Sequence, residues 1–113
     1  MIHIEIGRDG TGAIQQIELS GHAGFAEYGS DIVCAAVSSQ VISVENSLTE
    51  LLNVVADVIV DDVEGGYLKL TLPAIDSADT QRDVQLLMRH LEFALQITAQ
   101  TYPEFIEITQ INL

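Results

Sequence analysis

The sequence contains little cysteine, little positive charge and no long uninterrupted hydrophobic run. Its one cysteine, Cys34, cannot form an internal disulfide, and Met1 is not followed by the basic and apolar segments of a secretion signal. We therefore expect a reducing, cytoplasmic location. The longest apolar stretch, residues 35–60, is interrupted by acidic and amide side chains, so we expect no membrane span and no membrane partner.

The scarcity of positive charge argues against nucleic acids as partners. Four Lys and Arg residues stand against 17 Asp and Glu residues, which gives a formal net charge of −13. Nucleic acids bind to basic surfaces, so we expect no direct contact with RNA or DNA. An acidic protein does attract basic partners, although the same charge could serve solubility alone. Hydrophobic residues still make up 48% of the chain, enough for one folded domain over residues 1–113.

Alternation of apolar and polar residues predicts a hairpin at the start of the chain. Residues 2–6 alternate isoleucine with polar side chains, and the segment AIQQIELSG reads as a second strand. Between them, GRDGTG supplies a turn at Asp9-Gly10. Ile14 is out of phase with the other apolar residues of its strand, which predicts a bulge near Gln15.

Two apolar stripes with helical spacing follow, separated by a second hairpin. The strands of that hairpin are predicted at Val58 to Val63 and Tyr67 to Leu72, around Gly65-Gly66. The first stripe consists of Val37, Val41, Val44, Leu48, Leu51 and Val55. The second consists of Val84, Leu87, Met88, Leu91 and Leu95.

Boundary residues delimit the second helix, and a last strand follows it. Asp76 and Ser77 are good caps before the helix, and Pro103 ends it. The segment FIEITQINL then alternates as a strand. The order ββαββαβ predicts an α+β fold, a two-layer sandwich in which two helices cover one face of a mostly antiparallel sheet of about five strands. The open face would carry polar residues: His3, Glu5, Tyr67, Lys69, Glu107 and Thr109.

The stretch SGHAGFAEYGSDIVCAAVSS carries the candidate chemistry. Cys34 is expected at, or within one turn of, the N-terminus of the first helix, where free amides and the helix dipole stabilise a thiolate. His22, at the end of a strand, could take the thiol proton and return it to a leaving amine. The amide of Cys34 and one other could stabilise the oxyanion. The alternative is that Cys34 packs as a small hydrophobic residue.

The residues between His22 and Cys34 have the composition of a lid. Gly21, Gly24 and Gly29 alternate with small residues and two aromatic ones, Phe25 and Tyr28, so the segment has little apolar mass of its own. Such a loop could close over a substrate.

Two further residues have open roles. Asp31 could orient the imidazole of His22 or cap the helix, and its carboxylate would also raise the thiol pKa. Ser38 could either pack or line the site with its hydroxyl. We expect no metal site, because His3, His22, Cys34 and His90 show no ligand spacing, and we expect no cofactor.

The quoted stretch resembles the ribosomal-processing cysteine proteases called Prp. The residues that carry the resemblance are Gly21-His22-Ala23, Gly29 and the run from Asp31 to Ser38, DIVCAAVS. The chain length and the ββαββαβ order are also similar to the family.

The resemblance implies a function. It would make Cys34 the nucleophile and His22 its base, under a mobile glycine-rich lid. The substrate would be the precursor of one bacterial large-subunit ribosomal protein, number twenty-seven, whose short N-terminal extension ends in aromatic residues before the cut. The family also implies a homodimer. Two alternatives stay open from the residues alone: a ribosome-assembly or interaction module without activity, and a thiol redox sensor.

Overall fold

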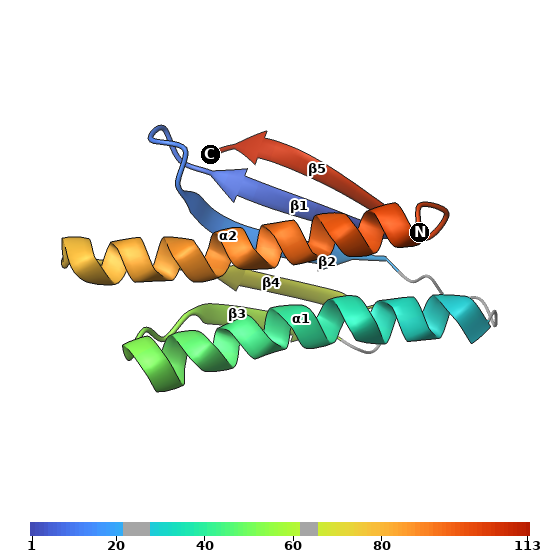
Figure 1. The fold of residues 1–113 in the computed structure, drawn as a ribbon, viewed down its shortest axis with the longest axis horizontal. Coiled ribbons are helices and arrows are strands. Elements are labelled where there is room, and N and C mark those ends of the chain that lie inside the picture. Colours follow the sequence, from blue (N-terminus) through green and yellow to red (C-terminus); the bar gives the residue numbers. More distant parts are fainter. Residues whose placement is uncertain (22–27, 62–65) are drawn as a thin grey trace.

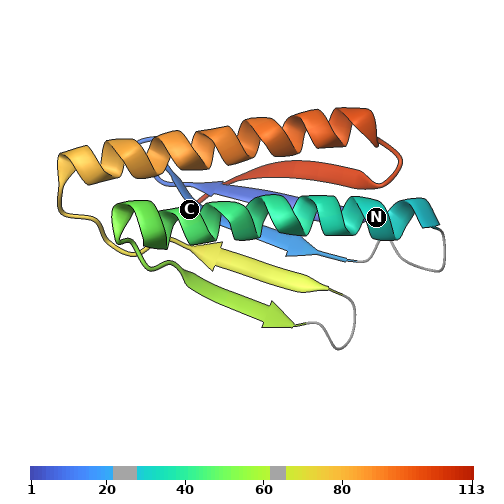
Figure 2. The same cartoon turned by 60° about the horizontal axis from the view of Figure 1, so that its bottom comes forward.

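The computed structural model describes residues 1–21, 28–61 and 66–113, and for residues 28–31 it describes the backbone only. Two helices lie on the same face of a five-stranded sheet (Figures 1 and 2). The elements are β1 (Ile2–Arg8), β2 (Ile14–Ser20), α1 (Tyr28–Leu52), β3 (Asp57–Asp61), β4 (Tyr67–Thr71), α2 (Ala78–Thr101) and β5 (Ile106–Asn112). The predicted ββαββαβ order and two-layer α+β architecture are confirmed.

The sheet is mixed, with strand order β3-β4-β2-β1-β5. β1 and β5 are parallel, whereas β1 with β2, β2 with β4, and β3 with β4 are antiparallel. The first and last strands therefore lie side by side, and β3 forms an outer edge. The sequence predicted a mostly antiparallel sheet, which is correct, but it did not give the strand order.

The predicted bulge lies at Gln15. Gly7 pairs with Gln16 and Arg8 pairs with Ile14, so Gln15 is the extra residue. This insertion turns Ile14 to the inner face, where it is completely buried. The turn before it spans three residues, Gly10 to Gly12, and not a two-residue corner, because the amide of Asp9 donates to the carbonyl of Ala13 at 2.9 Å.

Helix α1 differs from the prediction at both ends. It begins at Tyr28, so Cys34 is its seventh residue and the first-turn position predicted for the thiol is wrong. It ends at Leu52, and Asn53 adopts a left-handed φ of 54°. The stripe is buried as far as Leu48, but Leu51 and Val55 are both 71% exposed. Leu52 and Val54 pack against the core in their place.

Helix α2 follows the prediction closely. Its buried residues are Val84, Met88, Leu91 and Leu95. Ser77 is the N-cap, and its hydroxyl accepts a hydrogen bond from the amide of Thr80 at 3.2 Å. The C-cap is Tyr102, directly before Pro103.

The core lies between the helices and the inner sheet face. The apolar side chains of β1, β2, β4 and β5 meet those of α1 and α2 there, with Ile4, Ile6, Ile17 and Leu70 fully buried. On the open face, His3, Glu107 and Thr109 are exposed, while Glu5, Tyr67 and Lys69 are half-buried. Neither described helix combines the length and apolarity needed to cross a bilayer.

Candidate active site

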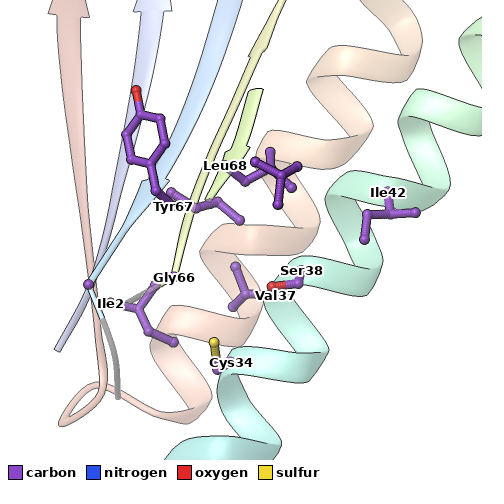
Figure 3. A pocket seen from close by; sticks show the side chains of 11 residues that line it. Ile2, Cys34, Val37, Ser38, Ile42, Gly66, Tyr67 and Leu68 are labelled. Atoms are coloured by element: carbon purple, nitrogen blue, oxygen red, sulfur yellow. The ribbon is translucent and has the colours of Figure 1, made fainter. Parts of the chain in front are cut away.

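A pocket of about 240 Å³ lies between the first half of α1 and the sheet. Its lining comes from the ends of β1 and β2, from β3 and β4, and from one face of α1 (Figure 3). The residues are Ile2, Leu19, Gly21, Cys34, Val37, Ser38, Ile42, Val60, Gly66, Tyr67 and Leu68. The wall is therefore mainly apolar, and the only cysteine of the chain belongs to it.

Cys34 is half-buried and packs against the core while also lining the pocket. Its sulfur lies at the end of the pocket near Ile2 and Gly66 (Figure 3). As the seventh residue of α1, Cys34 follows the first four amides of the helix, which are the ones left without intrahelical partners. The expectation that its own amide would be free for an oxyanion is therefore not met.

Gly21 brings the chain from β2 to the wall of the pocket. Its φ is +88°, and a Cβ built on it would lie 2.5 Å from the backbone oxygen of Met1. Both facts require glycine, because other residues rarely adopt this φ and a backbone oxygen cannot move aside cheaply. Gly21 is therefore fixed at the pocket wall, and His22 is the next residue in the sequence.

Ser38 lies one helical turn after Cys34 and lines the same pocket. It is one of two residues with a hydroxyl among the described residues of the lining. The other is Tyr67, whose hydroxyl donates to Glu18 at 2.8 Å, and this bond raises the tyrosine pKa. Because the hydroxyl of Tyr67 is engaged on the open face, Ser38 and Cys34 supply the polar side-chain atoms available inside the described pocket.

The remaining predicted site residues are not placed as side chains. His22, Gly24 and Phe25 lie outside the described residues. Tyr28, Gly29 and Asp31 belong to the first turns of α1, but only their backbone is described, so Asp31 lies within the helix and not before it. The lid, the base and the role of Asp31 stay predictions.

Sequence reasoning missed the outer part of the pocket. Ile42 lies two turns beyond Cys34, and Val60 comes from the edge strand β3. The spacing of Cys34, Ser38 and Ile42 at intervals of four could have indicated a shared helix face. Nothing in the sequence shows that the sheet leaves a space beneath that face.

A polar cluster away from the pocket ties α2 to the sheet. Both oxygens of Glu92 accept hydrogen bonds from the guanidinium of Arg8 at 2.7 Å, and Gln110 donates to the same carboxylate at 3.0 Å. The hydrogen bond from Arg8 is the main cause that lowers the pKa of Glu92. We assign this cluster to stability, since it lies outside the Cys34 pocket.

The two histidines outside the quoted stretch have different surroundings. The Nδ1 atom of His3 is 3.4 Å from a carboxylate oxygen of Glu107, and His90 faces shallow surface grooves beside Arg89 and Ser43. Within residues 1–21, 28–61 and 66–113, no three His, Cys, Asp or Glu side chains gather as metal ligands.

Comparison with known proteins shows which family the chain is similar to. Residues 1–107 match the family model described as cysteine protease Prp. The chain is 32% identical over 109 residues to the ribosomal processing cysteine protease Prp of Staphylococcus aureus, covering 96% of this chain and 97% of that protein. It is 28% identical to the Bacillus subtilis protein of the same name, with 96% of each chain covered.

Solved structures show the same architecture. A crystal structure of a Streptococcus mutans protein superposes with a TM-score of 0.88 at 34% identity, covering 100% of this chain and 96% of that one. The essential ribosomal processing protease Prp of S. aureus in complex with a substrate peptide gives a TM-score of 0.83 at 26% identity, covering 97% and 99%. The same protease with a covalently linked product peptide gives 0.80 at 30% identity, with 97% and 99% again covered. This chain therefore belongs to the Prp family of ribosomal processing cysteine proteases, and it is a cysteine protease.

Proposed function

We propose that Cys34 and His22 cleave a peptide bond by acyl transfer. The thiolate of Cys34 attacks the scissile carbonyl carbon and forms a C–S bond, while His22 holds the thiol proton. His22 gives this proton to the leaving amine as the C–N bond breaks. Water, deprotonated by His22, then hydrolyses the thioester, releasing the new carboxyl group and restoring the thiol.

The observation that carries this proposal is the pocket shared by Cys34 and Gly21. The residue after Gly21 is His22, so the base would start from the wall that already holds the nucleophile. The mainly apolar lining would exclude bulk water from the thioester, and Ser38 offers a hydroxyl to a substrate amide or carbonyl. Asp31 would orient His22 or stabilise the start of α1.

The proposed substrate is the precursor of large-subunit ribosomal protein twenty-seven, from which a short N-terminal extension is removed. Ribosomal proteins are basic, and the net charge of −13 would favour their capture. Phe25, in the proposed lid, and Tyr28, the first residue of α1, could stack on the aromatic residues before the cut. The protein would act in the cytoplasm as a homodimer, without a cofactor and without direct contact with nucleic acid.

The test is a mass-spectrometric cleavage assay with a peptide that copies the extension and its junction, under reducing conditions. We expect wild type to make a single cut after the aromatic residues, and Cys34→Ala to lower kcat/KM by at least about 10³-fold. Ser39→Ala is the matched control: Ser39 is exposed on the same helix outside the pocket, and its loss should leave the rate unchanged.

His22→Ala distinguishes a protease from a redox sensor. A protease loses turnover with this variant even when the thiol still reacts with an alkylating reagent. If wild type leaves the cognate peptide intact, or if Cys34→Ala cuts as fast as wild type, the proposed function is wrong.

A further inference from the structure

The pocket that contains Cys34 continues to an open, apolar outer end. Ile42 is 44% exposed and Val60 is 55% exposed, yet both line the pocket. Leu19 and Leu68, deeper in the same pocket, are only 6% and 7% exposed. Exposure therefore rises from the interior towards the β3 edge, where solvent meets an uncovered apolar surface.

One wall of this passage is a straight face of α1. Cys34, Ser38 and Ile42 follow one another at intervals of four residues, so they lie on the same side of the helix (Figure 3). At the rise of an α-helix, the Cα atoms of Cys34 and Ile42 are about 12 Å apart along the axis. The thiol and the outer end are thus separated by a defined length.

The floor of the passage is one row of side chains across three strands. Leu19 pairs with Leu68 between β2 and β4, and Leu68 pairs with Val60 between β4 and β3. All three point to the inner sheet face and line the pocket. Since α1 runs alongside the strands (Figure 2), this row crosses the passage, and the length of the passage is the distance of about 12 Å along α1. An extended chain advances about 3.3 Å per residue, so a peptide needs three or four residues to span that length.

We propose that Ile42 and Val60 form a specificity site for an apolar side chain three or four residues from the scissile bond. The inference rests on the proposed peptide cleavage at Cys34 and adds a sequence preference to it. The occupant is an aliphatic side chain of the substrate, because the outer end presents branched apolar atoms from both walls and is continuous with the thiol pocket.

A set of peptides locates the preference. Each carries the same cleavage junction, with a single leucine, alanine or glutamate placed at positions two to six from the cut, on either side. For wild type we expect leucine to exceed glutamate in kcat/KM by about 10-fold or more at one position, three or four residues away, as expected for one well-buried aliphatic side chain.

Val60→Lys should change this preference without disturbing the core, because Val60 is more than half exposed. With this variant, the glutamate peptide should become the better substrate at that position and at no other. Ile59→Lys is the matched control: Ile59 is 52% exposed on the same strand but points to the opposite sheet face. It adds the same charge outside the pocket and should keep the wild-type preference.

Three results separate the two proposals. A preference that inverts in Val60→Lys and not in Ile59→Lys supports the specificity site, and Ile42→Ala should weaken the leucine preference at the same position. If wild type cuts all peptides equally, or if both lysine variants behave alike, the specificity site is refuted while the protease stands. If wild type cuts no peptide, both proposals fall together.

Discussion

The half of the molecule under α2 and the half under α1 cover the same sheet with different chemistry. At α2, polar side chains reach across to the strands: Glu92 binds Arg8, and the side-chain amide of Gln85 donates to and accepts from the backbone of Ile14, each at 2.8 Å. At the first half of α1, apolar side chains meet the sheet and a pocket of about 240 Å³ remains between them. Figure 2 shows β3 at the outer edge beyond α1.

The two halves therefore serve different purposes: the α2 half stabilises the fold, and the α1 half leaves room for a substrate. The bulge at Gln15 interrupts the strand pairing, and Gln85 satisfies the backbone of Ile14 in place of a strand neighbour. The α2 half is thereby fixed by directional bonds. The α1 half keeps its surface apolar and incompletely filled, as a site for an extended peptide requires. Changes in the two halves should consequently affect different measurements.

Outside the catalytic pair, the largest effect is expected at Gly21. Gly21→Ala forces a Cβ against the backbone oxygen of Met1 and strains a φ of +88°, so the chain leading to His22 must shift. A displacement of about 1 Å in a catalytic group can cost about 100-fold in rate, and we expect that loss in kcat/KM for the cognate peptide.

Gly12→Ala is the control for this variant. Gly12 has the same φ of +88°, but a Cβ there meets no atom within 4 Å. It should lose about 1 kcal/mol of stability and no activity. Equal activities for the two alanine variants would contradict the importance that we give to the path of the chain at Gly21.

A smaller effect, on stability only, is expected at Glu92. Its side chain is 14% exposed and forms a bidentate pair with Arg8. Glu92→Gln should lower the free energy of unfolding by about 2 kcal/mol at pH 7, measured by urea denaturation, because a charge-assisted pair is lost in a mostly buried place. The cleavage rate should stay at the wild-type value.

The pH dependence of that effect follows from the lowered pKa of Glu92. The carboxylate contributes its stabilisation above its usual pKa of 4.5, and the contribution is lost as the pH falls through the lower value in the folded state. The difference between wild type and Glu92→Gln should therefore shrink below pH 4.5. Glu107→Gln, which removes an exposed partner of His3, should cost much less at pH 7. Equal losses for the two variants would refute the distinction.

The smallest effect is expected at the start of α2. Ser77→Ala removes the hydroxyl that accepts from the amide of Thr80, at a cost of about 1 kcal/mol in the free energy of unfolding. Ser39 is exposed to solvent and lies well inside the ends of α1. Its replacement by alanine should be neutral or slightly stabilising, because alanine has a higher helix propensity than serine. Thermal unfolding of both variants tests the difference in sign.

Local patterns in the sequence were sufficient for the elements and for one irregularity. The phase of Ile14 indicated the bulge at Gln15, and Ser77 indicated the start of α2. The start of α1 was missed because the glycine-rich run before Cys34 has no clear boundary signal. Leu51 and Val55 keep the helical spacing, yet they are exposed, because Leu52 and Val54 make the contacts with the core at the end of the helix.

Features that depend on distant residues could not be predicted. The pair of Arg8 and Glu92 joins residues 84 positions apart, and no local pattern marks either one. The outer end of the pocket likewise depends on how far α1 stands from β3 and β4. The thiol was found from its neighbours in the sequence, whereas the space in front of it required the tertiary structure.

The edge strand β3 also limits how copies of this protein can meet. Its sequence, Asp57 to Asp61, places three apolar residues between two aspartates. If two such edges paired antiparallel about Ile59, each Asp57 would face the Asp61 of the other copy, and like charges directly opposite destabilise a strand pair. Val60 can thus stay accessible at the edge of the sheet, because repulsion between Asp57 and Asp61 disfavours the pairing of two β3 edges.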